Sequence, residues 1–153
     1  MSDTDDKKKR ELYVHAQRRL VGSLLFDDKD IAQVLETISV DDIEEPLYNM
    51  LFVEIAELHR NSEIISVTTV AERLQNSGKL EKVGGTAGIY KLWSDGEKYA
   101  ADAGSLIYAR IIKESSAKAK ISRTLQESEN NFFDNSGVSA VAAVSELQLS
   151  LIH

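Results

Sequence analysis

The sequence has no cysteine and only one proline, Pro46. Without cysteine there can be no disulfide and no thiolate metal site, which fits a reducing compartment. A single proline leaves long segments free to be helical. No apolar run reaches the ~20 residues of a membrane-spanning helix, and the start MSDTDDKKKR lacks the apolar stretch of a secretion signal. We therefore expect a soluble, cytoplasmic protein without a membrane partner.

Positive charge and aromatic residues are also scarce. The chain has 18 Lys and Arg against 25 Asp and Glu, a formal net charge of −7, and 7% of its residues are aromatic. Tight nucleic-acid binding depends on cations that neutralise phosphates, and single-strand binding adds stacking aromatics. The composition therefore argues against direct DNA binding and favours protein partners or self-association.

Motifs for catalysis, nucleotides and metals are missing. Lys79 follows Gly78, but the upstream glycine and the following Ser or Thr of a phosphate-binding loop are absent, and residues 84–88 (GGTAG) do not match a dinucleotide-binding turn. Glu54 and His59 are five residues apart, which does not place them on one helical face, and no nucleophile lies in register. We expect no catalytic, cofactor-binding or metal-ligating residue in this chain.

The apolar residues recur at spacings of three and four, which is the period of amphipathic helices. In residues 66–93, Ser66 is placed as an N-cap, an apolar face follows, and Gly78 comes where the helix should end. Gly84 and Gly85 break the chain again before a second helical pattern. The three glycines predict a structural turn between two helices, and the fold class is all-α.

Other segments fit the same pattern. An apolar face extends from about Arg10 and is interrupted by Gly22, which predicts that another helix packs closely there. Pro46 suits the first turn of a helix that closes with His59 and Arg60. Residues 94–104 are polar, contain glycine and are expected to be a connection.

We expect three parts in the chain. Residues 1–9 form a disordered polar tail, residues 10–98 a compact globule of about five to six helices, and residues 99–153 an antiparallel helical hairpin. An exposed apolar stripe usually marks a protein contact. The stripe predicted to be the hairpin's interface consists of Ile107, Ile111, Ile121, Leu125, Val144, Leu147 and Leu151. The open alternative is that the hairpin folds back onto its own globule.

Five segments, in order, resemble patterns of the N-terminal domain of DnaB-type replicative DNA helicases, a resemblance that covers residues 11–152. The segments are HAQRRLVGSLL (15–25), DIEEPLYNMLF (42–52), ISVTTV (65–70), GKLEKVGG (78–85) and YARIIKE (108–114). They are similar to A-E-x-x-V-L-G-x-L-L, D-F-Y-x-P-x-H-x-x-I-F, I-D-x-V-T-L, G-x-L-E-x-V-G-G and Y-A-R-I-V-K-E. Gln17 stands where glutamate is usual, and Ile43, Glu44 and Tyr48 replace Phe, Tyr and His. These departures suggest a divergent or phage-borne member.

In that family the domain is a six-helix globule with a helical hairpin, and it precedes the ATPase. The resemblance implies that hairpins pair into dimers, and that trimers of dimers form the collar of a hexameric ring. It also implies that the collar docks primase and, in some systems, a loader. The chain itself is expected to be non-catalytic, because the motor that binds ATP and Mg²⁺ and unwinds DNA 5′→3′ would start beyond His153.

Other functions stay open at this stage. A stand-alone regulator, for example one encoded by a phage, would mimic the collar and bind a replicative helicase or primase. The helicase-binding domain of primase shares the architecture, although residues 78–85 favour the helicase. Direct single-strand binding would need a basic groove with stacking aromatics, which the composition disfavours.

Overall fold

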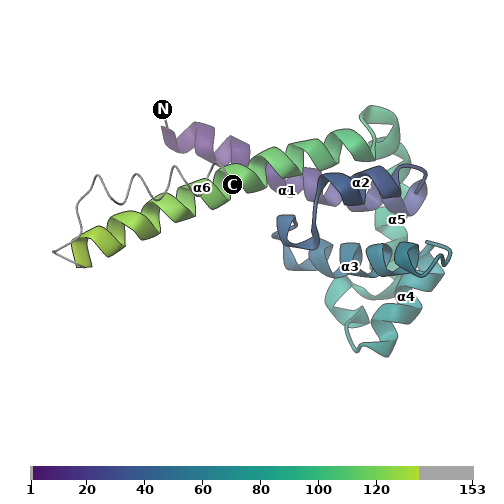
Figure 1. Ribbon diagram of the computed structural model, residues 1–153. Helices are drawn as coiled ribbons and strands as arrows, with labels where there is room; N and C mark the ends of the chain where they lie inside the picture. The colour runs from purple at the N-terminus through teal and green to yellow at the C-terminus, as the bar shows by residue number, and fades with distance from the viewer. Residues whose placement is uncertain (1, 135–153) are drawn as a thin grey trace. The chain divides into compact units, whose positions relative to one another are not determined.

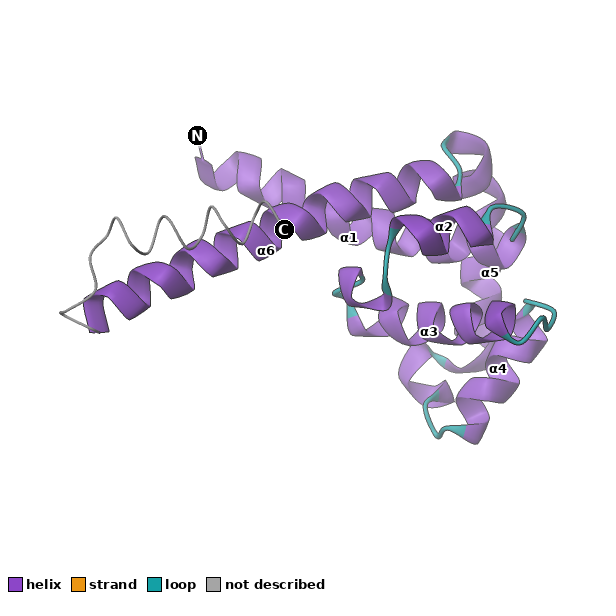
Figure 2. Ribbon diagram, viewed as in Figure 1, coloured by secondary structure: helices purple, strands orange, loops and turns teal. Residues whose placement is uncertain are grey.

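The computed structural model describes residues 2–134, and the regular elements in this range are helical (Figure 1 and Figure 2). In chain order they are α1 (Ser2–Phe26), α2 (Ile31–Thr37), η1 (Val40–Asp42), α3 (Pro46–Arg60), α4 (Val67–Asn76), η2 (Leu80–Val83), α5 (Gly85–Asp102) and α6 (Ser105–Asp134), where η marks a short 3-10 helix. No strand occurs in this range, so the predicted all-α class is confirmed. The chain divides into a first unit, Met1–Ser115, and a second unit, Ser116–His153, with the boundary inside α6.

The core of the first unit is built from one apolar face of each long helix. Large side chains with less than 2% of their surface exposed come from α1, α3, α4, α5 and α6: Leu20, Leu24, Phe52, Ile55, Leu74, Ile89 and Ile112. Their spacing along α1 and α3 is three or four residues, as an amphipathic helix requires. Full burial of one such side chain contributes about 1.5–3 kcal/mol, so this shared core holds the helices together.

Helices α1 and α5 cross with two glycines in contact. Gly96 is buried in α5, and a Cβ added to it would overlap the carbonyl oxygen of Gly22 in α1. A Cβ on Gly22 would lie 2.9 Å from the Tyr99 ring and 3.0 Å from the Leu92 carbonyl oxygen. Backbones come this close only where no side chain separates them. The close packing predicted at Gly22 is therefore confirmed.

The connection expected at residues 94–104 is wrong, because α5 continues through most of this stretch to Asp102. In the sequence, Gly96 resembles a helix breaker, yet it is helical because its missing side chain makes room for α1. The chain turns at Gly104 instead, with a φ of +92° that favours glycine. Residues 99–102, assigned to the hairpin from the sequence, therefore belong to α5, and α6 begins at Ser105.

The first helix also differs from expectation, because α1 begins at Ser2 where a disordered tail is predicted. Asp3 and Asp5 occupy its first turn, at the positive end of the helix dipole. Each is followed four residues later by a base, Lys7 and Lys9, in the order that supports a helix. The stability of this helix therefore depends on the order of the charges, which composition alone does not contain.

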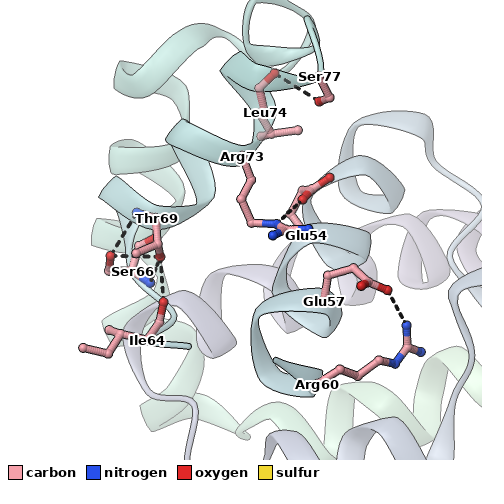
Figure 3. Close-up of polar contacts among 9 residues, drawn as sticks. All are labelled: Glu54, Glu57, Arg60, Ile64, Ser66, Thr69, Arg73, Leu74 and Ser77. Carbon is pink, nitrogen blue, oxygen red and sulfur yellow. Dashed lines mark hydrogen bonds and ion pairs between the residues drawn. The ribbon is translucent and has the colours of Figure 1, made fainter. Parts of the chain in front are cut away.

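Local signals set the ends of α3 and α4 as predicted. Pro46 lies in the first turn of α3, and Ser66 caps α4 (Figure 3). The Ser66 Oγ accepts a hydrogen bond from the Thr69 N–H at 3.1 Å, and the Thr69 Oγ1 accepts one from the Ser66 N–H at 2.9 Å. Between the two helices, Arg73 Nε donates to Glu54 Oε2 at 2.6 Å. Glu54 is thus engaged in an ion pair that joins α3 to α4.

Candidate functional site

The part of the chain that the structure describes contains no group of His, Cys, Asp and Glu side chains that could hold a metal ion. Within the same residues, no helix has both the length and the apolar character to cross a membrane. A hollow of about 190 Å³ is lined by Gln75, Gly78, Leu80 and Glu81. One carboxylate among these four residues makes no acid–base or nucleophile–base pair. Among the described residues, the remaining candidate sites lie on the surfaces of the helices.

Two of the three glycines of the predicted turn, Gly78 and Gly84, lie in the connection between α4 and α5, and the third begins α5. Gly78 follows Ser77, the C-cap of α4, and Gly84 is the N-cap of α5. Gly85 is the first residue of α5, and all three have a positive φ. Their place in the chain sets the direction in which α5 leaves α4.

The first turns of α6 are anchored to the globule of the first unit. Tyr108 and Ile112 are buried, and the Tyr108 hydroxyl donates to the Tyr99 carbonyl oxygen at 2.9 Å. Lys113 Nζ lies 3.6 Å from the buried carboxylate of Asp42. Contacts to two other segments therefore fix this end of α6 and leave its opposite side outward.

The predicted interface residues on α6 differ in exposure. In the first unit, Ile107 is exposed, whereas Ile111 is half-buried and packs against the core. In the second unit, Ile121 and Leu125 lie one turn apart and are 39% and 48% exposed. The other three predicted residues lie outside the described range: Val144, Leu147 and Leu151.

A polar network joins α1, α3 and α5. Arg18 donates to Asp95 Oδ2 at 2.8 Å, to the Tyr99 hydroxyl at 3.0 Å and to the Tyr48 hydroxyl at 3.4 Å. Burial lowers the pKa of Arg18, but the three hydrogen bonds outweigh it, so the pKa lies above its ordinary value. Arg18 and, to a lesser extent, Lys91 hold the pKa of Asp95 below its ordinary value. The sequence gives no sign of this network, because Tyr48, Asp95 and Tyr99 lie 30 to 81 residues from Arg18.

Three aromatic side chains lie together where α1 ends against α5, and we call Phe26, Tyr90 and Trp93 the aromatic surface. The centroid of the Trp93 ring lies 5.4 Å from that of Tyr90 and 6.2 Å from that of Phe26. Tyr90 is 58% exposed, Phe26 is also exposed, and Trp93 is half-buried. This surface was not expected from the sequence. The available signal was the three-residue spacing of Tyr90 and Trp93.

The sequence of this chain is similar to those of known proteins. The family model described as the DnaB-like helicase N terminal domain matches residues 11–114. The chain is 25% identical, over 166 aligned residues, to the replicative DNA helicase DnaB of Buchnera aphidicola subsp. Baizongia pistaciae, covering 91% of this chain and 35% of that protein. It is 31% identical, over 99 residues, to the replicative DNA helicase DnaB of Mycobacterium leprae, covering 65% of this chain and 16% of that protein. The chain thus spans about a third or less of the length of these relatives.

A solved structure shares the fold. The crystal structure of the N-terminal domain of DnaB helicase from Mycobacterium tuberculosis aligns with a TM-score of 0.74 and 23% identity, covering 88% of this chain and 92% of that one. The match extends over nearly all of that chain, so the common fold is that of the domain rather than of a fragment. The structural match shows the shared fold, and the family match over most of the sequence shows that the chain belongs to the family of DnaB-like helicase N-terminal domains.

Proposed function

We propose that this chain is the collar domain of a replicative DNA helicase, assembling the subunits of a hexameric ring and docking primase and, where one exists, a loader. The observation that carries the proposal is the pair of exposed aliphatic side chains on α6, Ile121 and Leu125. The helicase setting is supported by the relatives, which are replicative DNA helicases. ATP hydrolysis, Mg²⁺ binding and unwinding would belong to a separate motor domain, and the collar would supply no catalysis.

The exposed residues of α6 set the scale of the interface. Ile121 and Leu125 are each roughly half exposed, so burying what remains contributes roughly 1 kcal/mol per side chain, or about 4 kcal/mol for the four copies in a two-fold dimer. Association itself costs about 4–15 kcal/mol of translational and rotational freedom. The two residues therefore do not suffice alone. Val144, Leu147 and Leu151, which the sequence predicts on the partner helix of the hairpin, are needed in the same interface.

The proposal is tested by molar mass from light scattering over a concentration series. The variant carries Ile121→Glu and Leu125→Glu, which place two carboxylates in the stripe. The matched control carries Ser122→Glu and Gln126→Glu, exposed positions one residue further along the same helix. We expect the wild type and the control to form dimers or larger assemblies, and the stripe variant to be monomeric with an unchanged far-ultraviolet circular dichroism spectrum.

Two results would refute assembly through α6. One is a wild type that stays monomeric up to millimolar concentration, since the stripe would then meet no second copy. The other is a stripe variant that assembles as well as the control does. Leu147→Glu extends the test to the part of the hairpin known only from sequence and should have the same effect as the α6 variant.

Primase is the second partner in this proposal. The net charge of −7 is unfavourable for phosphate and leaves a protein as the better ligand. Isothermal titration of purified primase into the assembled chain should give saturable binding, whereas a single-stranded oligonucleotide should give none. Heat from the oligonucleotide but not from primase would remove the docking part of the proposal while leaving the assembly part intact.

A further inference from the structure

The aromatic surface is formed by two helices that the glycine crossing brings together. Phe26 ends α1, and its Cβ would lie 3.1 Å from a Cβ placed on Gly96 of α5. Trp93 pairs with Phe26 on one side and with Tyr90 on the other, at centroid distances typical of favourable aromatic pairs. Such rings are rigid, large and partly polar, which is why aromatic residues are enriched at the centres of protein interfaces.

The chain that leaves the aromatic surface at Phe26 is acidic. Asp27, Asp28 and Asp30 follow it, with Lys29 as the one base among them. Lys29 Nζ lies 3.9 Å from Asp27 Oδ2, so part of its charge is already balanced within this loop. The last turn of α1 carries no basic residue, and its carbonyl groups add negative potential at the same place.

The face of α5 that carries Trp93 is acidic as well. At about 100° per residue, Glu97 lies only about 40° around the helix from Trp93. Lys91 and Lys98 lie about 140–160° away by the same rule, and Lys91 Nζ is 3.5 Å from the Asp95 carboxylate. Measured from Tyr90, Glu97 lies about 20° away, whereas Lys91 and Lys98 lie about 100° and 80° away, so Glu97 is nearer around the helix to both rings than either base is. We call Asp27, Asp28, Asp30 and Glu97 the acidic rim.

We propose that the aromatic surface and its acidic rim bind a basic amphipathic segment of a partner protein. Apolar side chains of the segment would cover the three rings, and its Lys or Arg side chains would lie over a ring face and against the rim carboxylates. The surface lies on α1 and α5, so this inference does not depend on assembly through α6.

The negative charge of the acidic rim argues against two other ligands of the aromatic surface. Single-stranded nucleic acid stacks on aromatic rings, but its phosphates would meet the four carboxylates of the acidic rim. A second copy of the chain, docked face to face by a two-fold axis, would bring one acidic rim against another. A basic segment instead gains from both the rings and the carboxylates.

The probe for the test is a synthetic helical peptide of leucine and lysine, about 18 residues or five turns long, with leucine along one face. Its control is the same peptide with glutamate in place of lysine. Each is titrated into the full chain at about 0.15 M salt, where the long-range attraction of exposed charges is screened. Trp93 is the chain's only tryptophan, so its emission reports on this surface alone. We expect a saturable change with the lysine peptide and none with the glutamate peptide.

Variants locate the binding. Tyr90→Ser removes an exposed ring and should weaken binding by about tenfold or more. Glu97→Gln together with Asp28→Asn should weaken it and flatten its dependence on salt. The control is Ile64→Ser, which removes an equally apolar side chain, 78% exposed, from the loop before α4 and should leave the affinity unchanged. Because all these positions are exposed, circular dichroism should show an unchanged fold.

Several outcomes would overturn the proposal. If the Tyr90→Ser variant binds the lysine peptide as tightly as the wild type does, the peptide is attracted only to the net charge of the chain. An emission change on raising the protein concentration without peptide would point to a second copy as the occupant. Saturation by an oligothymidine strand would identify nucleic acid as the ligand instead.

Discussion

Replacing Gly96 with alanine tests the close crossing of α1 and α5. Alanine would raise the intrinsic helix propensity of α5 by about 1 kcal/mol, so a view limited to local structure predicts a more stable protein. In the structure, however, the added methyl group overlaps the carbonyl oxygen of Gly22. The obstacle is backbone and has no rotamer by which to yield.

The magnitude follows from the separation that the two helices need. Real Cβ atoms essentially never lie within 3.0 Å of another heavy atom, so α1 and α5 must move apart by on the order of 1 Å. Such a gap removes a quarter to a half of the dispersion attraction of the atoms that line it. Taking the upper end of the usual range for overpacking, about 3 kcal/mol, and subtracting the propensity gain leaves a net loss of about 2 kcal/mol. For a chain of 153 residues this corresponds to a melting temperature lower by about 6 °C.

The assay is urea unfolding followed by Trp93 emission and by far-ultraviolet circular dichroism, whose transitions should coincide if unfolding is two-state. The matched control is Ser94→Ala, an exposed position on the same helix where alanine adds no atom, so stability should change by less than about 0.5 kcal/mol. A Gly96→Ala protein as stable as the wild type, or more stable, would refute the argument that the glycine is required by the crossing.

The remaining predictions concern single interactions. Ser66→Ala removes the acceptor for the Thr69 N–H and should lower the free energy of unfolding by about 1 kcal/mol in urea, whereas the exposed Thr68→Ala should change it little; equal effects would contradict a capping role. Asp95→Asn should be less stable than the wild type near neutral pH. Because the folded-state pKa of Asp95 is lowered, the carboxylate's contribution is complete above the unfolded value of about 3.9 and is lost as the pH falls through the folded value. The difference between the two proteins should therefore close in acid, and a difference independent of pH would rule out the Arg18 contact as its source.

The predictions that the structure confirms depended on rules that involve only neighbouring residues. Pro46 and Ser66 mark helix starts through chemistry confined to one turn, and the period of the apolar residues predicts which faces are buried. Gly22 even allowed a tertiary contact to be predicted, because a glycine inside a helix is unfavourable unless another element packs closely against it.

Where the structure differs from a prediction, the cause is either a contact with a distant part of the chain or the order of charged residues. Gly96 has the same appearance as a connecting glycine, and only the position of α1, more than seventy residues earlier, shows that it is helical. The helix at residues 2–9 depends on which acid precedes which base, and a composition argument does not contain that order. The aromatic surface likewise needed a contact between Phe26 and α5. The predicted hairpin residues beyond the described range stay predictions.

The hydrogen bond between Arg18 and Tyr99 has a consequence for synthesis in the cell. The two residues are 81 positions apart, so at about 5–20 residues per second the ribosome takes roughly 4–16 s to add the partner after Arg18 has been made. During that interval the apolar side of α1 has no α5 to cover it. The first helix of this domain is thus made early and packed late, and nascent chains stopped before α5 should be the ones that chaperones retain.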